Sequence, residues 1–253
     1  MSGHSKWSTI KRKKGAADAK RGQLFTKLTR EITVSAKEGG GDPDSNFRLR
    51  LAVQRARTEN MPAENIQRAI QRGSGVGGDG VTYEEITYEG YGPNGVAMLV
   101  QSLTDNRNRT VAEVRSIFTK MGGSLGEAGS VGWMFESRGL ITIEPKAGQD
   151  ADDITLMAID AGAEDVSVDE EGNVEVVTSF EGLKRVQDAL TSQGLNVTHA
   201  ETTMIPKTTM SLDDKSTEQA LRMVERLEDL DDVQTVYTNL DLTHADALMA
   251  SMS

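Results

Sequence analysis

The hydrophobic periodicity of this chain changes once, across a glycine-rich segment at residues 73–80. Before that segment, apolar residues recur at helical spacing, as in Leu24, Leu28 and Ile32. After it, apolar residues alternate or form short runs, which are typical of strands. A glycine-rich stretch of this kind is typical of a linker between domains. We therefore expect a helical domain over residues 1–80, followed by sheet-containing domains.

Three helices are expected in the first domain. The first surrounds the apolar residues from Leu24 to Ile32 and is stopped by the glycines at 39–41. The second runs from about Asn46 to Glu59. The third opens with a proline at a first helical position, Pro62, and ends at Gly73.

The segments after residue 80 indicate a mixed sheet and helix structure. Residues 84–89 and 96–103 have strand-like patterns and are separated by a Pro-Asn-Gly turn. A helix follows from about Arg107 to Met121, and Asp105 can cap it. Residues 131–135 are predicted to form a further strand.

The later segments predict an inserted domain. Residues 138–206 follow the order strand, helix, strand, strand, helix, strand, which is that of a ferredoxin-like unit. Strand 207–212, helix 216–227 and strand 233–237 are too few to form a domain alone, so we expect them to complete the earlier sheet. The predicted fold class is α+β with three domains: 1–80 helical, 81–137 plus 207–240 α/β, and 138–206 ferredoxin-like and inserted in the middle one.

Charge is divided unequally along the chain. Residues 1–80 carry 16 lysines and arginines against 8 acidic residues, whereas residues 81–253 carry 12 against 31. The overall net charge of -11 therefore hides a strongly basic first third. Such asymmetry indicates a polyanionic partner for the basic part, with the acidic remainder pointing away from it.

The basic third has the features that phosphate binding requires, namely several cations on one rigid face and a basic arm. Residues 11–14 form a Lys-Arg-Lys-Lys run on that arm. Trp7 either stacks on a base or ribose, or anchors the arm on the helices. The nucleic-acid-binding candidates are His4, Lys6, Trp7, Lys11, Arg12, Lys13, Lys14, Lys20, Arg21, Lys27, Arg30, Arg48, Arg55, Arg68, Arg107 and Arg109.

Two further clusters have alternative interpretations. Residues 104–110 place two arginines and two asparagines at a helix start, where backbone amides attract anions. They form either a second phosphate contact or an ordinary cap and turn. The five glycines between residues 122 and 132 follow a helix and precede a strand, whereas a phosphate-cradling loop follows a strand and opens a helix. We interpret them as a tight connection with close backbone approach.

Composition argues against most enzymatic chemistry. The chain has no cysteine, and His4, His199 and His244 lack partners at metal-ligand spacing. Nothing singles out a catalytic carboxylate pair. We therefore expect no enzyme activity, metal, cofactor or small-molecule substrate. No apolar run approaches the roughly 20 residues of a membrane span, and no signal peptide is evident, so we expect a cytoplasmic protein without a membrane partner.

Several longer motifs resemble those of one known family, the YebC/PmpR family. The motifs are spread from residue 1 to about residue 136, with weaker similarity beyond. They are Met1-Ser2-Gly3-His4-Ser5-Lys6-Trp7, Phe25-Thr26-Lys27-Leu28, Asn60-Met61-Pro62, Tyr88-Glu89-Gly90-Tyr91-Gly92-Pro93, Leu103-Thr104-Asp105-Asn106-Arg107-Asn108-Arg109-Thr110 and Gly129-Ser130-Val131.

The resemblance implies a three-domain protein, the third domain inserted in the second, without established enzymatic activity or cofactor. It also implies a DNA-binding transcriptional regulator. Relatives that activate mitochondrial translation imply an alternative, a translation factor that binds the ribosome or its RNA and assists synthesis of difficult, proline-rich sequences. The sequence contains no zinc finger, strong helix-turn-helix signature or RRM aromatic motif, which favours the alternative on physical grounds.

Overall fold

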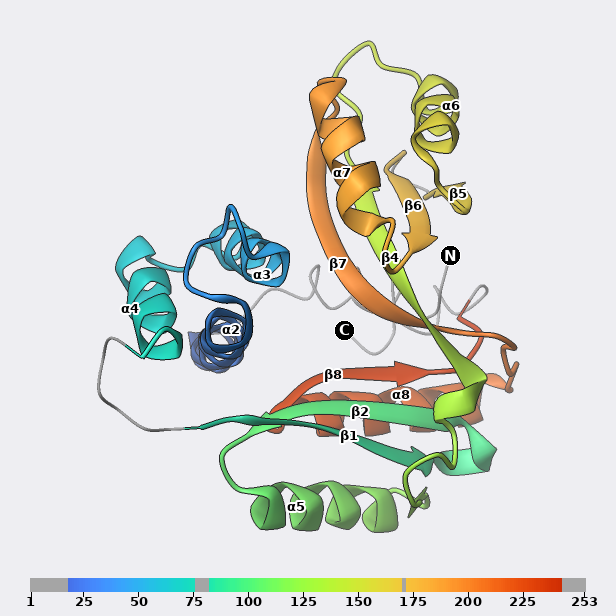
Figure 1. Cartoon of the computed structure of the whole chain (residues 1–253). Coiled ribbons are helices and arrows are strands. Elements are labelled where there is room, and N and C mark those ends of the chain that lie inside the picture. The colour runs from blue at the N-terminus through green and yellow to red at the C-terminus, as the bar shows by residue number, and fades with distance from the viewer. Residues whose placement is uncertain (1–17, 76–81, 170–171, 243–253) are drawn as a thin grey trace.

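The computed structural model describes residues 18–75, 82–169 and 172–242. It has a mixed α/β architecture, with a helical N-terminal region and two regions that each contain a four-stranded sheet (Figure 1). In Figure 1 the helices α2 to α4 lie to one side of both sheets.

The helical region follows the predicted periodicity closely. Its helices are α2 (Asp18–Gly39), α3 (Phe47–Thr58) and α4 (Ala63–Gly73). Leu28 and Ile32 of α2 pack with Leu49 of α3 and with Ile66 and Ile70 of α4 in one buried cluster. The regular spacing of these residues puts them on one face of each helix, which is why the sequence predicts all three helices.

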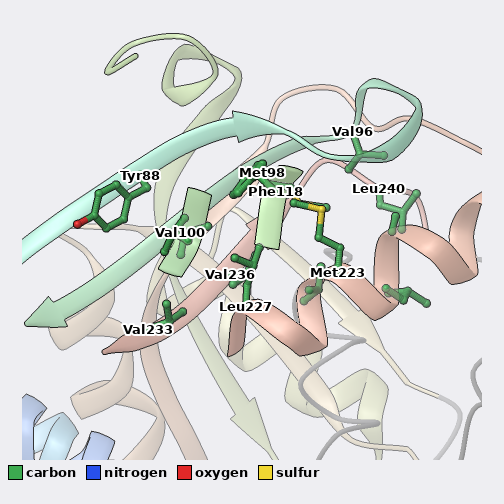
Figure 2. Close-up of a cluster of buried hydrophobic side chains, with 14 of the residues drawn as sticks. Tyr88, Val96, Met98, Val100, Phe118, Met223, Leu227, Val233, Val236 and Leu240 are labelled. Carbon is green, nitrogen blue, oxygen red and sulfur yellow. The ribbon is translucent and has the colours of Figure 1, made fainter. Parts of the chain in front are cut away.

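The first sheet has the strand order β3-β1-β2-β8, and its strands are β1 (Glu84–Tyr91), β2 (Ala97–Thr104), β3 (Ser124–Leu125) and β8 (Val233–Thr238). Helices α5 (Arg107–Lys120) and α8 (Asp214–Glu228) lie along one face of this sheet (Figure 1). Figure 2 shows the core between them, where Phe118 and Met223 meet Met98 and Val236. The antiparallel pairing of β8 with β2 shows that residues 233–238 return to the sheet begun near residue 84.

The second sheet has the strand order β5-β6-β4-β7 and is antiparallel throughout. Helices α6 and α7 pack against it and supply Ile154 and Leu190 to its core. Its elements, in chain order, are β4 (Phe135–Ile143), α6 (Ala151–Ala161), β5 (Asp165–Val168), β6 (Val174–Ser179), α7 (Leu183–Ser192) and β7 (Val197–Pro206).

The two sheets also share a small core of their own. Phe135, the first residue of β4, and Val131, four residues before it, pack together in this core. Their partners are Ala97 and Leu99 of β2 and Tyr237 of β8. This cluster lies on the face of the first sheet that α5 and α8 leave uncovered, because neighbouring residues of a strand point to opposite faces. The second sheet region thus packs on the first through these buried side chains.

The structure corrects two predicted strands. Residues 131–135 instead form the 3-10 turn η2 (Gly132–Met134) followed by the first residue of β4. Residues 207–212 contribute one isolated bridge, between Met210 and Leu240, and form no strand. In the first segment Val131 and Phe135 are buried by tertiary packing, and in the second Met210 and Leu212 are partly buried against the core of the first sheet. Neither packing needs a strand ladder, so hydrophobicity alone was misleading.

A helix cap is also corrected. Asn106, not Asp105, caps α5, since its side chain accepts the backbone N–H of Arg109 at 3.1 Å. The carboxylate of Asp105 instead lies 2.8 Å from Arg109 Nη2.

Candidate nucleic-acid interface

Seven of the predicted contact residues lie before residue 18. His4, Lys6, Trp7, Lys11, Arg12, Lys13 and Lys14 lie outside the residues that the structure describes. Lys20 lies in α2, at a position where only the backbone is described. The other eight candidates are described below by their contacts within the chain and by their exposure, and three of them, Arg48, Arg68 and Arg109, are both bonded and exposed.

Two candidates from different regions, Arg30 of α2 and Arg109 of α5, meet on one carboxylate. Arg30 Nη1 lies 2.8 Å from Asp232 Oδ1, and Arg109 Nη2 lies 2.7 Å from Asp232 Oδ2. The hydroxyls of Thr104 and Thr110 contact the same carboxylate at 3.1 and 2.7 Å. We call these five residues the Asp232 cluster.

The carboxylate of Asp232 is nearly completely buried, with 3% of its side chain exposed. Burial alone raises its pKa, but hydrogen bonds from Thr110 and Arg109 and the charge of Arg30 outweigh that effect and lower the pKa. The cluster therefore holds a charged carboxylate between α2 and the first sheet. These contacts use the guanidinium groups of both arginines to neutralise the carboxylate.

Further polar side chains of α2 meet the carboxyl end of α8. Lys27 Nζ donates to the carbonyl of Glu228, and Gln23 Nε2 donates to the carbonyl of Asp229. Cations are favourable at this end of a helix, where unpaired carbonyls give a partial negative charge. Lys27 thus helps to dock the helical region on the first sheet region.

The candidates of α3 form ion pairs with acids of the chain. Arg48 lies 2.6 Å from a carboxylate oxygen of Glu38 and 2.7 Å from one of Glu85. Arg55 Nη1 lies 3.6 Å from Glu31. Burial lowers the pKa of each arginine, but the surrounding carboxylates raise it by more. These arginines are therefore at least partly neutralised by the protein itself.

Arg48 and Arg55 also line a cleft of about 520 Å³ that the helical region shares with both sheet regions. Its charged lining residues are Glu31, Arg48, Arg55, Glu85, Glu181, Lys184 and Glu201. Four of these are carboxylates, which repel phosphate, so the cleft does not suit a nucleic-acid backbone.

Five candidates are exposed. Arg48 and Arg109 are exposed although they form the ion pairs described above, and the others are Arg21 of α2, Arg68 of α4, and Arg107 at the start of α5. Arg57 and Arg72, on α3 and α4, are exposed as well. The structure therefore brings Arg30 and Arg109 together on Asp232. Arg68 contacts Asn65 and Glu64 of its own helix, and Arg21, Arg57, Arg72 and Arg107 are exposed at the surface.

Sequence reasoning missed Asp232, which looks like part of a solvated Asp-Asp pair in an acidic stretch. Residues elsewhere in the chain did indicate that a buried acceptor was needed. Thr104, Arg109 and Thr110 fall in one short motif, and all three side chains donate hydrogen bonds to this one acceptor.

The glycines between residues 122 and 132 form a tight connection, as expected. A β-carbon at Gly123 would lie 2.5 Å from the carbonyl oxygen of Tyr91, so only glycine fits there. The backbone N–H groups of Gly129, Val131 and Gly132 donate to the Glu89 carboxylate at 2.8, 2.8 and 2.6 Å. An incoming phosphate would have to displace this carboxylate, so these amides do not form a phosphate cradle.

Neither a membrane span nor a metal site is found among the described residues. No helix in them is long and apolar enough to cross a membrane. No group of three or more histidine, aspartate or glutamate side chains in the same ranges converges to hold a metal ion.

Comparison with known proteins gives consistent matches over nearly the whole chain. A "Probable transcriptional regulatory protein" of Herpetosiphon aurantiacus is 57% identical over 243 residues, covering 96% of both chains. A protein of the same name from Roseiflexus castenholzii is 59% identical over 246 residues, with the same coverage. The crystal structure of a conserved hypothetical protein from Aquifex aeolicus matches with a TM-score of 0.80 and 42% identity, covering 88% of this chain and 91% of that chain.

Two family models match adjoining parts of the sequence. The model described as "TACO1/YebC protein N-terminal domain" matches residues 5–76, and the one described as "TACO1/YebC second and third domain" matches residues 83–240. These matches confirm the resemblance carried by the sequence motifs. The chain therefore belongs to the TACO1/YebC family.

Proposed function

We propose that this chain is a non-enzymatic, cytoplasmic regulator that binds nucleic acid through its basic N-terminal region. The observation that carries the proposal is the charge asymmetry, 16 cations against 8 acids in residues 1–80 of a protein whose net charge is -11. The exposed arginines of α2, α3 and α4 support it. Cations concentrated on one part of an acidic protein attract a phosphate backbone to that part.

Duplex DNA is the first candidate ligand. It is favoured by the names of the relatives, which are called probable transcriptional regulatory proteins. Specific regulation would require this chain to prefer its own site over random duplex by at least about 10³-fold at physiological salt.

Ribosomal RNA on the ribosome is the second candidate, which would make the chain a translation factor for difficult, proline-rich sequences. It is favoured by the pairing of Arg30, Arg48 and Arg55 with acids of the chain. A helix that reads the major groove presents a row of free side chains. The paired arginines leave α2 and α3 with few such groups.

One experiment separates the two candidates. Co-sedimentation of the full chain with ribosomes from lysate is compared with its binding to promoter-derived and random duplex DNA, all at the same salt concentration. A preference for particular DNA of about 10³-fold would support transcriptional regulation. Sedimentation with ribosomes and no DNA preference would support the translation role. Failure to bind either would refute nucleic-acid binding altogether.

The basic arm supplies a sharper prediction. Changing Lys11, Arg12, Lys13 and Lys14 together to alanine should weaken binding to all sequences alike. For duplex DNA, each phosphate that the protein no longer neutralises reduces the slope of log affinity against log salt by about 0.9, so the slope should fall by about 3–4. The slope is measured by fluorescence anisotropy at several salt concentrations.

A matched control removes the same charge elsewhere. Lysines 120, 146, 184 and 215 are exposed and belong to the sheet regions, so their replacement by alanine should leave the slope unchanged. If both quadruple variants lower the slope equally, overall charge drives binding and the arm has no particular role.

We also propose that the predicted domains are the functional units: 1–80, 81–137 plus 207–240, and an inserted ferredoxin-like domain, 138–206. The chain order of β4 to β7, strand, helix, strand, strand, helix, strand, supports the last of these. The pairing of β8 with β2 supports the insertion, because the second unit is built from both sides of the third.

A further inference from the structure

Trp133 is turned out of the protein between two buried residues. The residues two positions before and two positions after it, Val131 and Phe135, are both in the core, whereas 67% of Trp133 is exposed. The 3-10 turn η2 causes this reversal, since Met134 N–H bonds to the carbonyl of Val131 at 2.9 Å. A large aromatic side chain would normally be buried for stability, so its exposure here requires another explanation.

The ring of Trp133 is held in position by hydrogen bonds. Its Nε1–H donates to the carbonyl of Ser130 at 3.2 Å, and the hydroxyl of Tyr91 donates to the same carbonyl at 3.1 Å. The loop that carries Ser130 is fixed in turn by the three amides that bind Glu89. These amides lower the pKa of Glu89 although its burial would raise it, which keeps the carboxylate charged as an acceptor. The indole is thus oriented before any ligand arrives.

The surroundings of Trp133 favour a flat ligand over an apolar protein surface. The exposed residues that precede it in the loop are Gly126, Glu127, Ala128 and Gly129, which provide no large apolar rim. The exposed aromatic residue bonded to the same carbonyl is Tyr91, whose hydroxyl is polar. Protein hot spots are usually surrounded by well-packed contacts, whereas bases stack on aromatic side chains that are open to solvent.

A cation is close to the same loop. The exposed Lys207 donates its backbone N–H to the carbonyl of Met134, the residue after Trp133, at 2.8 Å. Its ammonium lies 3.9 Å from Glu136, a distance that leaves a weak ion pair and an accessible charge. Proteins that hold single-stranded nucleic acid combine aromatic rings with positively charged side chains along the backbone.

We propose that Trp133 is a stacking platform for an unpaired base of single-stranded nucleic acid, with Lys207 near the neighbouring phosphate. The inference rests on the proposed nucleic-acid binding, but it assigns a second contact, distant in sequence from the basic arm. Glu89 is a positioning residue in this scheme, because it acts through the loop and not on the ligand.

The tryptophan content of the chain makes a direct test possible. The sequence has two tryptophans, Trp7 and Trp133, so Trp7→Phe leaves Trp133 as the sole indole reporter. Single-stranded 12-mers of uridine and of thymidine are titrated into this variant at low salt. Stacking should quench the emission of Trp133 saturably, with the same midpoint as the anisotropy of the fluorescein-labelled 12-mer.

Substitutions test the contribution to affinity in the same Trp7→Phe background. Trp133→Ala should weaken binding of the 12-mer about tenfold, and Trp133→Phe should weaken it less, because stacking of one base is worth roughly that factor. Phe180→Ala is the matched control, since Phe180 is another aromatic residue that is half exposed, and it should leave affinity unchanged. Circular dichroism checks that each variant remains folded.

The outcomes separate this inference from the proposed function. Anisotropy that rises without quenching, with Trp133→Ala unchanged in affinity, would overturn the stacking platform and leave nucleic-acid binding intact. Trp133 would then be a contact for protein. No change in either signal with the single-stranded 12-mers would also overturn the stacking platform, and the proposed function would then be decided by the binding of the native chain to duplex DNA and ribosomes. Quenching together with a loss of affinity in Trp133→Ala would establish the platform.

Discussion

A single carboxylate, that of Asp232, holds two arginines of different regions. Asp232→Asn keeps the size of the side chain but removes its charge, which leaves Arg30 buried without a counter-ion. Removal of one partner from a buried ion pair costs about 3–5 kcal/mol. Because Arg109 is 42% exposed and keeps Asp105, we expect a loss near the lower limit, about 3 kcal/mol in the free energy of unfolding. Urea denaturation at neutral pH measures it, and the exposed Asp160→Asn should cost less than about 0.5 kcal/mol.

The pH dependence of the same variant is a separate prediction. The folded-state pKa of Asp232 is lowered, so its contribution to stability is present above the ordinary value of about 3.9. That contribution is lost as pH falls through the folded-state pKa. The stability difference between the native chain and Asp232→Asn should therefore be constant from about pH 7 to about pH 5 and shrink below about pH 4. A difference that already disappears near neutral pH would contradict the assigned charge state.

The turn between α2 and α3 depends on Asn46, whose two amide atoms serve different helices. Its Oδ1 accepts the N–H of Leu49 at 3.1 Å and caps α3, while its Nδ2 donates to the carbonyls of Ser35 and Gly40 at 2.7 and 2.8 Å. Aspartate is an equally good cap, but it would place an oxygen against both carbonyls. We expect Asn46→Asp to lose about 2–3 kcal/mol, no less than Asn46→Ala. Urea unfolding followed by circular dichroism tests this, and full stability in Asn46→Asp would refute it.

Helices and strands with regular spacing could be predicted from the sequence, because one buried face dictates that spacing. Helices α2 to α4 and the strands β1 and β2 follow from this rule. The segments around Val131 and Met210 could not be predicted, because they are loops whose apolar side chains pack against residues distant in the chain. Likewise, no local pattern tells that Asp232 will meet Arg30, two hundred residues earlier in the chain.

In the whole molecule, the helical region is attached to the first sheet region partly through Lys27 and Arg30. Replacing both with alanine removes the contacts with Glu228 and Asp232 without touching the core of either region. We expect amides of α2 to α4 to lose hydrogen-exchange protection at lower urea than those of β2, instead of together with them. The exposed Arg72→Ala is the control and should leave the profile unchanged. Coincident loss of protection in the double variant would show that these two side chains do not couple the regions.

The sequence identifies a basic region, but it does not tell which of the arginines there form ion pairs within the chain. Charge counts identify the basic region without regard to contacts. Which arginines form ion pairs depends on where the fold places acidic residues that are distant in the chain. Asp232, for example, lies beside Arg30 and Arg109. Tertiary ion pairs of this kind leave no periodic signal in either segment.

The placement of β8 has a consequence for the order of events during synthesis. The helical region has its own core and can form early, as soon as its residues have left the translating machinery. The first sheet must wait, because β2 meets β8 only after some 130 further residues have been added. Until then β2 presents an open apolar edge, and α2 has no carboxylate to receive Arg30. A nascent chain that stops before Val233 should therefore expose the apolar edge of β2 and bind chaperones. Once β8 has been synthesised, it can pair with β2 and Asp232 can receive Arg30 in one late step.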